Sequence, residues 1–155
     1  MTIAIYPGSF DPITNGHIDI LKSGTEIFEK VIVAVSYNSQ KAGFLPVDVR
    51  EKLIRESVEG IRNVEVMSFE GLTVEFAKKC GAEVLLRGLR TSLDFEYEMQ
   101  LAQTNTSLYN RIKTIFLISK PEYNFISSSG IREILMNNGD ISNFVPAPVA
   151  QYLMK

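Results

Sequence analysis

The chain has 155 residues, of which 45% are hydrophobic and 22% charged, a composition typical of a globular protein rather than a disordered or membrane-embedded one. Its 16 basic and 18 acidic residues give a formal charge of -2, so no overall positive charge attracts nucleic acid. No apolar run reaches the roughly 18 residues of a membrane span, and the first residues do not have the pattern of a signal peptide. We therefore expect one cytoplasmic domain over residues 1–155, with neither nucleic acid nor a membrane as partner.

Short runs rich in β-branched residues predict strands at residues 2–6, 31–36, 64–69, 83–86 and 114–119. Most are almost continuously apolar, as strands covered on both faces are. Helical patterns follow the strands, at residues 48–60, 72–81, 92–109, 129–138 and 148–154. This alternation predicts an α/β fold, a Rossmann-like doubly wound sheet of five parallel strands with helices on both faces.

Ligands of such sheets bind beyond the carboxyl ends of the strands, so the loops there are the candidate sites. The first loop reads "YPGSFDPITNGH" and holds the only histidine, His17. Gly8 allows a close approach of backbone to ligand, and Thr14 is a candidate N-cap that places His17 in the first helical turn. Backbone N–H groups there would face an anion. The alternative is a tight turn in which the histidine has only a capping or structural role.

Three further loops carry groups that suit phosphate. Lys41 follows the second strand, although a loop lysine is commonly only solvated surface. Arg87 and Arg90 flank a Gly-Leu pair after the fourth strand, where guanidinium groups suit phosphate geometry, with structural ion pairs as the alternative. Three serines, residues 127–129, open a helix after the fifth strand. Each signal is weak alone, but four such loops at one sheet edge predict a site for a phosphorylated ligand.

The helix at residues 92–109 carries two carboxylates, Asp94 and Glu98, one turn apart. Since like charges four residues apart repel, we expect one of them to bind Arg90 or a ligand hydroxyl, and a solvated helix face is the alternative. Phe95, Met99 and Ala102 share one row of this helix, and we expect them to be packing residues rather than contacts of a cofactor.

Several common nucleotide and hydrolase motifs are absent. The sequence has no GxxxxGK[ST] loop, and its first turn does not read GxGxxG, which excludes a P-loop NTPase and a dinucleotide-dependent dehydrogenase. It also has no GxSxG nucleophile elbow. Covalent catalysis is therefore disfavoured.

Two segments resemble known signatures. "TNGH" at residues 14–17 resembles the [H/T]xGH motif of the nucleotidyltransferase superfamily, and "SSSGIR" at residues 127–132 resembles its ISSSxxR motif. With "YPGSFDPITNGHIDI", Lys41, "LLRGLR", "DFEYEMQLA" and "FISSS", the chain closely resembles the bacterial phosphopantetheine adenylyltransferase family from residue 3 to about residue 146. The resemblance implies transfer of the adenylyl group of ATP to 4'-phosphopantetheine, giving dephospho-coenzyme A and pyrophosphate.

The resemblance also implies residue roles. His17 would stabilise the transition state, with Lys41 and Arg90 as further catalytic cations. The positions matching the 4'-phosphopantetheine site are Ser9, Lys41, Thr73 and Arg87. The positions matching the ATP site are Ser9, Phe10, His17, Gly88, Leu89, Arg90, Glu98, Tyr123, Asn124, Phe125, Ile126, Ser127, Ser128 and Ser129. Ser9 stands where threonine is frequent and Tyr123 where tryptophan can occur, but both keep the hydroxyl or the aromatic face.

The same resemblance implies Mg²⁺, a homohexamer and feedback by coenzyme A. Because the chain has no Cys or His cluster, we expect the metal to be held by substrate phosphates and water, with no protein ligand set. Two alternatives remain open on the sequence. One is another small nucleotidyltransferase, a nicotinamide mononucleotide adenylyltransferase or a cytidylyltransferase, and the other is a non-catalytic nucleotide sensor.

Overall fold

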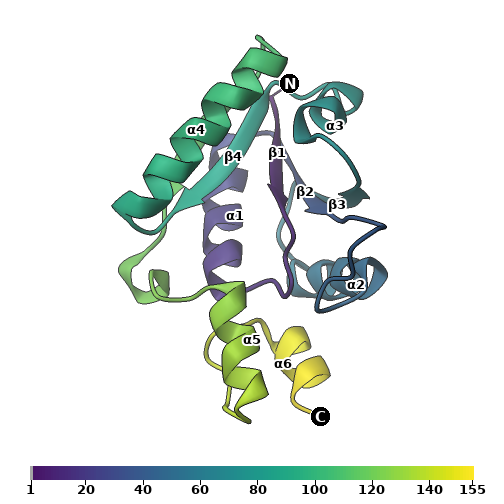
Figure 1. The fold of residues 1–155 in the computed structure, drawn as a ribbon, viewed down its shortest axis with the longest axis vertical. Helices are drawn as coiled ribbons and strands as arrows, with labels where there is room; N and C mark the ends of the chain where they lie inside the picture. The colour runs from purple at the N-terminus through teal and green to yellow at the C-terminus, as the bar shows by residue number, and fades with distance from the viewer. Residues whose placement is uncertain (1) are drawn as a thin grey trace.

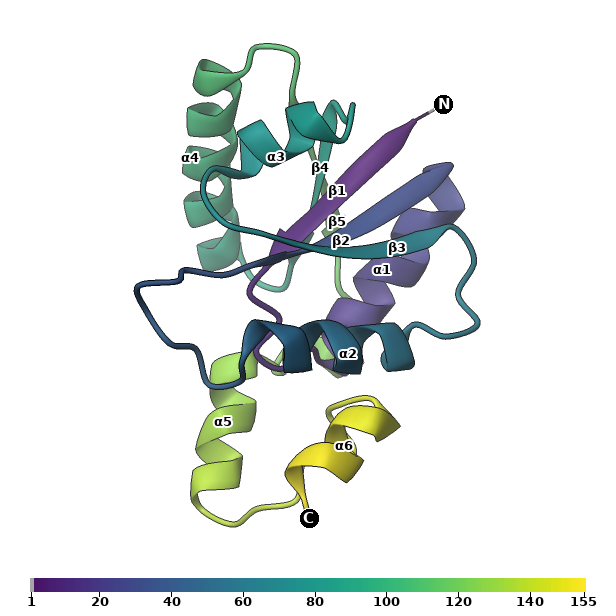
Figure 2. The same ribbon diagram turned by 90° about the vertical axis from the view of Figure 1, so that its right-hand side faces the viewer.

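A computed structural model describes residues 2–155 and shows five strands in one parallel sheet (Figures 1 and 2). The strands are β1 (Ile3–Gly8), β2 (Lys30–Ser36), β3 (Val64–Phe69), β4 (Val84–Leu89) and β5 (Lys113–Ile118). Their order is β3-β2-β1-β4-β5, with every neighbouring pair parallel. The predicted α/β Rossmann-like sheet is confirmed, and its strand order reverses between β1 and β4.

Four helices follow the first four strands and lead to the next one, and two more follow β5. They are α1 (Asn15–Ile27), α2 (Val47–Ser57), α3 (Thr73–Lys79), α4 (Ser92–Leu108), α5 (Ser128–Met136) and α6 (Ala147–Leu153), with a short 3-10 helix at Pro121–Tyr123. Gly60 and Gly81 follow α2 and α3 with φ of 88° and 67°. Gly81 directly follows the C-cap of α3, so this left-handed backbone, which glycine adopts without strain, ends α3 as the sequence predicts. By contrast, α2 already ends at Ser57, three residues before Gly60.

Alternate residues of the strands face two separate cores. Ala4 and Tyr6 of β1 belong to one buried cluster and Ile5 to the other, as the period of two in a strand requires. The first cluster packs against α1, α2, α5 and α6, and the second against α3. Figure 2 shows α1 and α2 on one side of the sheet and α3 and α4 on the other. Covering both faces explains why the strand sequences are continuously apolar.

The two C-terminal helices lie beyond the carboxyl end of β1, at the lower end of the molecule in Figure 1. Ile141, Val145 and Val149 are buried there in the first cluster. The backbone N–H of Asn15, at the start of α1, donates to the carbonyl of Phe144 at 2.9 Å. The start of α5 lies beside the turn before α1, because Ser128 Oγ donates to the Pro12 carbonyl at 2.8 Å.

The expected packing of the row on α4 is only partial. Glu98 is the one buried residue of α4, while Phe95 and Met99 remain 44% and 40% exposed. Phe95 contacts Phe116 of β5 edge to face, with ring centroids 5.9 Å apart. Because α4 contacts β4, β5 and α3 along one side of the sheet, its apolar residues outside that contact have nothing to cover them within residues 2–155.

No described helix combines the length and the apolar character that crossing a bilayer would need.

Candidate functional site

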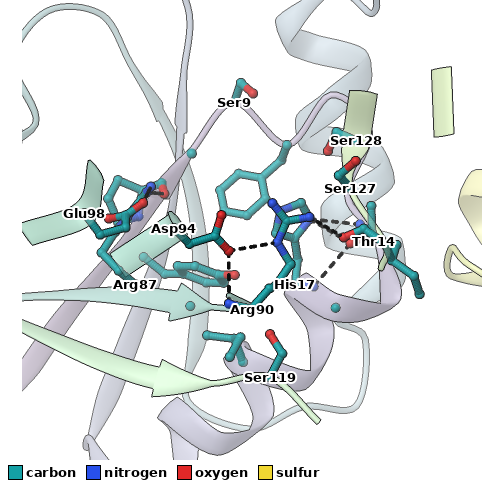
Figure 3. Close-up of a pocket in the computed structure, with 18 residues that line it drawn as sticks. Ser9, Thr14, His17, Arg87, Arg90, Asp94, Glu98, Ser119, Ser127 and Ser128 are labelled. Atoms are coloured by element: carbon teal, nitrogen blue, oxygen red, sulfur yellow. Dashed lines mark hydrogen bonds and ion pairs between the residues drawn. The ribbon is translucent and has the colours of Figure 1, made fainter. Parts of the chain in front are cut away.

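A cavity of about 270 Å³ opens at the carboxyl ends of β1 and β4, where the strand order reverses. Reversal points of this kind are where doubly wound sheets bind ligands. Figure 3 shows Arg87 and Glu98 at one side of this cavity and Thr14, Ser127 and Ser128 at the other. A second cavity of about 110 Å³ adjoins it and shares four lining residues with it, Pro7, Gly8, Arg87 and Glu98. The two cavities therefore meet at the Arg87–Glu98 pair.

Thr14 and His17 form a capping box at the start of α1. The Thr14 side chain accepts the backbone N–H of His17 at 3.3 Å, and the backbone N–H of Thr14 donates to His17 Nδ1 at 3.0 Å. The predicted N-cap is confirmed, and the histidine occupies the position that Glu or Gln usually fills in this motif. Because Nδ1 accepts a hydrogen bond, the proton of the neutral ring is on Nε2.

The His17 ring is held neutral. Burial lowers its pKa from 6.5 to about 4, and the positive charges of Arg87 and Arg90 act in the same direction. The Phe10 ring lies edge to face against it, with centroids 5.0 Å apart. At neutral pH the ring therefore offers a single N–H donor, Nε2–H, from the wall of the larger cavity.

The turn before Thr14 brings Phe10 back over β1. Phe10 has a φ of 46°, in the left-handed region that side chains rarely adopt. A Cβ on Gly8 would lie 3.2 Å from two ring atoms of Phe10, so the ring packs where a larger residue 8 would stand. This close approach leaves Ser9 and Phe10 in the cavity wall beside His17.

Arg87 and Glu98 form a two-pronged ion pair. Arg87 Nε and Nη2 donate to the Glu98 carboxylate at 2.8 and 2.6 Å, and Nη1 donates to the Pro7 carbonyl at 2.7 Å. Burial disfavours the guanidinium charge, but the hydrogen bond and the charge of Glu98 outweigh it and raise the pKa of Arg87. Burial also raises the pKa of Tyr6, which lies nearby, against the opposing effect of Arg87. Both structural pairing and ligand binding are thus open to Arg87, since Nη1 and Nη2 each carry a second hydrogen.

Arg90 ties the loop after β4 to the loop after β5. Its Nη1 donates to the Ile126 carbonyl at 2.9 Å, and its Nε lies 3.3 Å from Asp94 Oδ2. Asp94, which also accepts the backbone N–H of Arg90 at 3.0 Å, is thus the carboxylate that binds this arginine. Among the described residues the Nη2 group of Arg90 has no hydrogen-bond acceptor, so it can donate to a ligand in the cavity that Arg90 lines.

The serines open α5 next to α1. Ser127 is the N-cap and accepts the N–H of Gly130 at 3.0 Å, while Ser128 Oγ donates to the Pro12 carbonyl at 2.8 Å. Both line the cavity, whereas Ser129 does not. Two helix N-termini, those of α1 and α5, therefore border one cavity, and such termini attract anions.

Gly88 leaves room for α1 to approach β4. A Cβ at this position would lie 2.8 Å from Ile20 Cγ1, closer than side chains approach. Gly88 also lines the larger cavity, so its backbone is accessible to a ligand there. The glycine between the two arginines thus has a packing reason as well as a place in the site.

Comparison with known proteins shows which family has sequences similar to this chain. Residues 5–134 match a family model described as cytidylyltransferase-like. The chain is 50% identical over its whole length to a phosphopantetheine adenylyltransferase of Desulfitobacterium hafniense, covering 95% of that protein. It is 53% identical over 149 residues to the phosphopantetheine adenylyltransferase of Gloeothece citriformis, covering 96% of this chain and 95% of that one. The chain belongs to the phosphopantetheine adenylyltransferase family.

One solved structure agrees with the fold of this phosphopantetheine adenylyltransferase family member. The crystal structure of a protein described as a nicotinate-nucleotide adenylyltransferase, from Vibrio parahaemolyticus, matches it with a TM-score of 0.77 and full coverage of both chains. The two sequences are only 21% identical, so this likeness concerns the fold alone.

Most residues predicted for the site are brought together by the fold, and some are not. Those lining the larger cavity are Ser9, Phe10, His17, Arg87, Gly88, Arg90, Glu98, Ile126, Ser127 and Ser128. Thr73 lines the smaller cavity. Those lining neither of the two cavities are Lys41, Leu89, Tyr123, Asn124, Phe125 and Ser129. Lys41 lies in an exposed stretch, and Phe125 is 71% exposed.

Sequence reasoning missed several polar residues that build the site of this family member. Ser119 lines the larger cavity, and Asp19, on α1, accepts the backbone N–H of Lys120 at 3.2 Å. Asp11 and Arg50 are 6% and 5% exposed. An Asp before Pro12 reads as an ordinary turn residue, and Arg50 lies in a helix with other charged residues, so neither pattern reveals burial.

The described residues form no metal site of their own. No three Cys, His, Asp or Glu side chains gather in residues 2–155 in a way that could hold an ion. The two carboxylates lining the larger cavity, Asp94 and Glu98, are engaged by Arg90 and Arg87. The residues present therefore fit a metal carried by a phosphorylated ligand better than a metal held in a cage of protein side chains.

Proposed function

We propose that this chain transfers the adenylyl group of ATP to 4'-phosphopantetheine, giving dephospho-coenzyme A and pyrophosphate. The observation that carries the proposal is the pair of adjoining cavities that meet at Arg87 and Glu98, since a two-substrate transfer needs two subsites with a common border. Family membership supports the choice of substrates, because proteins about 50% identical over the whole chain are phosphopantetheine adenylyltransferases.

The reaction needs no protein nucleophile. A phosphate oxygen of 4'-phosphopantetheine attacks the α-phosphorus of ATP, a new P–O bond forms, and the bond to the bridging oxygen of the leaving pyrophosphate breaks with its electron pair. The attacking oxygen is already anionic, so the obstacle is to bring two polyanions together in line. Cations and N–H donors perform this task in the proposed mechanism.

The catalytic groups in this proposal are His17, Lys41 and Arg90. His17 donates Nε2–H to an oxygen of the α-phosphoryl group, where negative charge grows during transfer. Its neutral state, with Nδ1 bound by the Thr14 N–H, supports this role as a donor rather than a general base. Lys41 and Arg90 reduce the repulsion between the two substrates, and the free Nη2 group supports this for Arg90.

Binding roles follow the two cavities. The proposed 4'-phosphopantetheine residues are Ser9, Lys41, Thr73 and Arg87. The proposed ATP residues are Ser9, Phe10, His17, Gly88 to Arg90, Glu98 and Tyr123 to Ser129. Their meeting point at Arg87 supports assigning the smaller cavity to the pantetheine arm and the larger one to the nucleotide. Lys41 and the 123–125 segment would border the substrates from outside these cavities.

Magnesium belongs to this proposal as part of the nucleotide complex. The ion would be held by ATP phosphates and water, and it would supply charge neutralisation for the departing pyrophosphate. The engagement of Asp94 and Glu98 by arginines supports assigning no side chain as its permanent ligand.

The proposal extends to assembly and feedback. A homohexamer of single-domain subunits, residues 1–155, would cover the apolar side chains exposed on α4 and β5, such as Leu93 and Ile118, which are 77% and 81% exposed. Light scattering after size-exclusion chromatography measures the subunit number.

Coenzyme A contains both the pantetheine arm and an adenylyl group, so we expect it to inhibit by competing for both cavities. The reaction is assigned to the cytoplasm.

One assay tests the proposal against its rivals. Pyrophosphate release is measured with ATP or CTP and Mg²⁺, against 4'-phosphopantetheine, nicotinamide mononucleotide and nicotinate mononucleotide as acceptors. We expect release with ATP and 4'-phosphopantetheine only. Release with CTP or with a mononucleotide acceptor would indicate a different nucleotidyltransferase, and ATP binding without any release would indicate a nucleotide sensor.

A further inference from the structure

Asp11 and Arg50 are buried charged side chains outside both cavities, and neither has a role in the reaction described above. Asp11 lies in the β1–α1 turn, and Arg50 lies in the first half of α2. A buried charge is costly unless it is fully bound by hydrogen bonds. The partners of these two charges show what they hold in place.

The Asp11 carboxylate binds one loop with both of its oxygens. Oδ2 accepts the backbone N–H of Phe44 at 2.7 Å, and Oδ1 accepts that of Leu45 at 2.8 Å. Phe44, which is exposed, and Leu45, which is buried, end the segment that contains Lys41, here called the Lys41 loop (residues 37–45). Two short, charge-assisted hydrogen bonds to consecutive N–H groups fix both the position and the direction of this end of the loop.

Arg50 binds the same end of the loop from the other side. Its Nε donates to the Leu45 carbonyl at 3.0 Å, and its Nη1 donates to the carbonyls of Ser9 and Ser36 at 2.8 and 3.0 Å. These three carbonyls belong to the Lys41 loop, the β1–α1 turn and the end of β2. The rigid guanidinium therefore sets the separation between Ser9 and the Lys41 loop.

The other half of the loop is tied to the end of β3. The backbone N–H of Tyr37 donates to the Phe69 carbonyl at 3.1 Å, and the backbone N–H of Ser39 donates to the Glu70 carboxylate. Lys41 lies between these two anchors, and its own backbone N–H donates to the Asn38 carbonyl at 3.0 Å. The backbone at Lys41 is thus fixed at both ends although its side chain is exposed.

The Lys41 loop passes so close to Asp11 that position 43 has no room for a side chain. A Cβ at residue 43 would lie 2.8 Å from Asp11 Oδ2 and 3.3 Å from the Leu45 carbonyl. Any larger residue would push the loop away from the carboxylate that holds it. Gly43 is itself exposed, so this constraint comes from the anchor and not from the protein core.

We propose that Asp11 and Arg50 are positioning residues that hold Lys41 and Ser9 in register to receive the phosphate of the acceptor. The inference rests on the proposed function, in which Lys41 and Ser9 bind 4'-phosphopantetheine. A shift of about 1 Å at such a group can lower turnover by on the order of 10²-fold, so a loose loop would impair transfer even when ATP is bound normally.

The first test replaces each anchor conservatively. Asp11→Asn turns one acceptor into an NH₂ group that faces an N–H donor, and Arg50→Lys cannot reach three carbonyls at once. We expect both to lower kcat/KM for 4'-phosphopantetheine by on the order of 10- to 100-fold while the Kd for ATP, whose proposed site includes Ser9 but not Lys41, rises much less. Equal weakening of ATP and acceptor in the folded variants would overturn the proposal.

Two control variants and one variant that keeps every buried side chain distinguish loop positioning from a general loss of folding. Arg55→Lys lies on the same helix and removes a similar arginine bond, to the Val66 carbonyl at 2.7 Å, and Asp140→Asn changes an exposed carboxylate that accepts the Ser142 N–H at 2.8 Å. Both should leave kcat/KM unchanged. Gly43→Ala displaces the loop without removing a buried side chain, and it should reproduce the Asp11→Asn effect. An unaffected Gly43→Ala enzyme would contradict the proposal.

A double-mutant cycle separates this inference from the proposed function. If Asp11 acts through Lys41, Asp11→Asn should have little further effect on kcat/KM in a Lys41→Ala background. Additive losses would show that Asp11 acts by another route. If Lys41→Ala alone leaves acceptor kinetics unchanged, the role of Lys41 is wrong and the inference fails with it. If Lys41→Ala lowers kcat/KM and Asp11→Asn does not, the inference is wrong but the proposed function stands.

Discussion

Thr14 and His17 cap each other across the first turn of α1, with the Thr14 N–H on His17 Nδ1 at 3.0 Å and the His17 N–H on the Thr14 hydroxyl at 3.3 Å. One imidazole therefore does two things. Its Nδ1 completes the helix start, and this bond determines that Nε2 carries the proton that faces the cavity. The Thr-x-Gly-His spacing follows from the three-residue reach of a capping box.

Two substitutions of His17 should separate these two roles. His17→Asn keeps an acceptor near the position of Nδ1 but has no donor at the position of Nε2, whereas His17→Ala loses both. We expect turnover to fall on the order of 10²- to 10³-fold in both variants, because each lacks the donor to the transferring group. Stability in urea should fall by about 1 kcal/mol in the alanine variant only. An asparagine variant with full turnover would show that the cap alone is what catalysis requires.

The lowered pKa of His17 predicts a pH dependence of stability. The folded protein holds this ring at a pKa of about 4, against 6.5 for an unperturbed histidine, so the unfolded chain binds more protons between those values. The stabilising contribution is therefore complete above pH 6.5 and is lost as the pH falls toward 4. Urea unfolding should therefore show His17→Asn as stable as the wild type at pH 7.5 and more stable than the wild type at pH 4.5. A difference independent of pH would contradict the neutral state of the ring.

Local signals explain what the sequence could predict. The N-cap at Thr14, the helix stop at Gly81 and the five strands each depend on residues within a few positions, and all are confirmed. The carboxyl-edge rule then predicted which loops meet, because parallel strands end at one edge. β4 was predicted too short, since Arg87 and Gly88 look like loop residues yet pair with Phe116 and Leu117 of β5.

Long-range contacts explain what the sequence could not predict. Asp11 binds residues 33 and 34 positions away, and Arg50 binds Ser9 across 41 positions, so no short pattern marks either residue as buried. The choice between Arg87 as an ion-pair partner and as a phosphate ligand was also undecided, because Glu98 approaches it only once α4 has packed on β4. The exposed apolar row of α4 resembled a core face, since periodicity cannot tell what will cover a helix.

The Arg87–Glu98 pair predicts opposite behaviour of stability and binding. Arg87→Ala leaves Glu98, which is 7% exposed, without its counter-charge, and we expect a loss of stability of about 3 kcal/mol. Adding Glu98→Gln should recover part of this loss because it removes the unpaired charge. Calorimetry should show that Arg87→Ala binds 4'-phosphopantetheine more weakly with ATP binding less affected, and that the double variant does not recover the acceptor. Comparable weakening of both substrates would show that Arg87 is purely structural.

Gly88 predicts a packing effect that reaches the catalytic helix. In Gly88→Ala the new methyl group would stand 2.8 Å from Ile20 Cγ1, on the helix that carries His17 one turn earlier. We expect a loss of about 1 to 3 kcal/mol in stability from overpacking and a lower turnover as α1 shifts. Ile20→Ala in the same chain should relieve the clash. The double variant should therefore lose less stability than the sum of the losses of the two single variants. Gly16→Ala is the stability control, because its Cβ would meet nothing closer than 3.5 Å and alanine favours a helix. Additive losses for Gly88→Ala and Ile20→Ala in urea unfolding would show that the contact between α1 and β4 is not what requires a glycine at position 88.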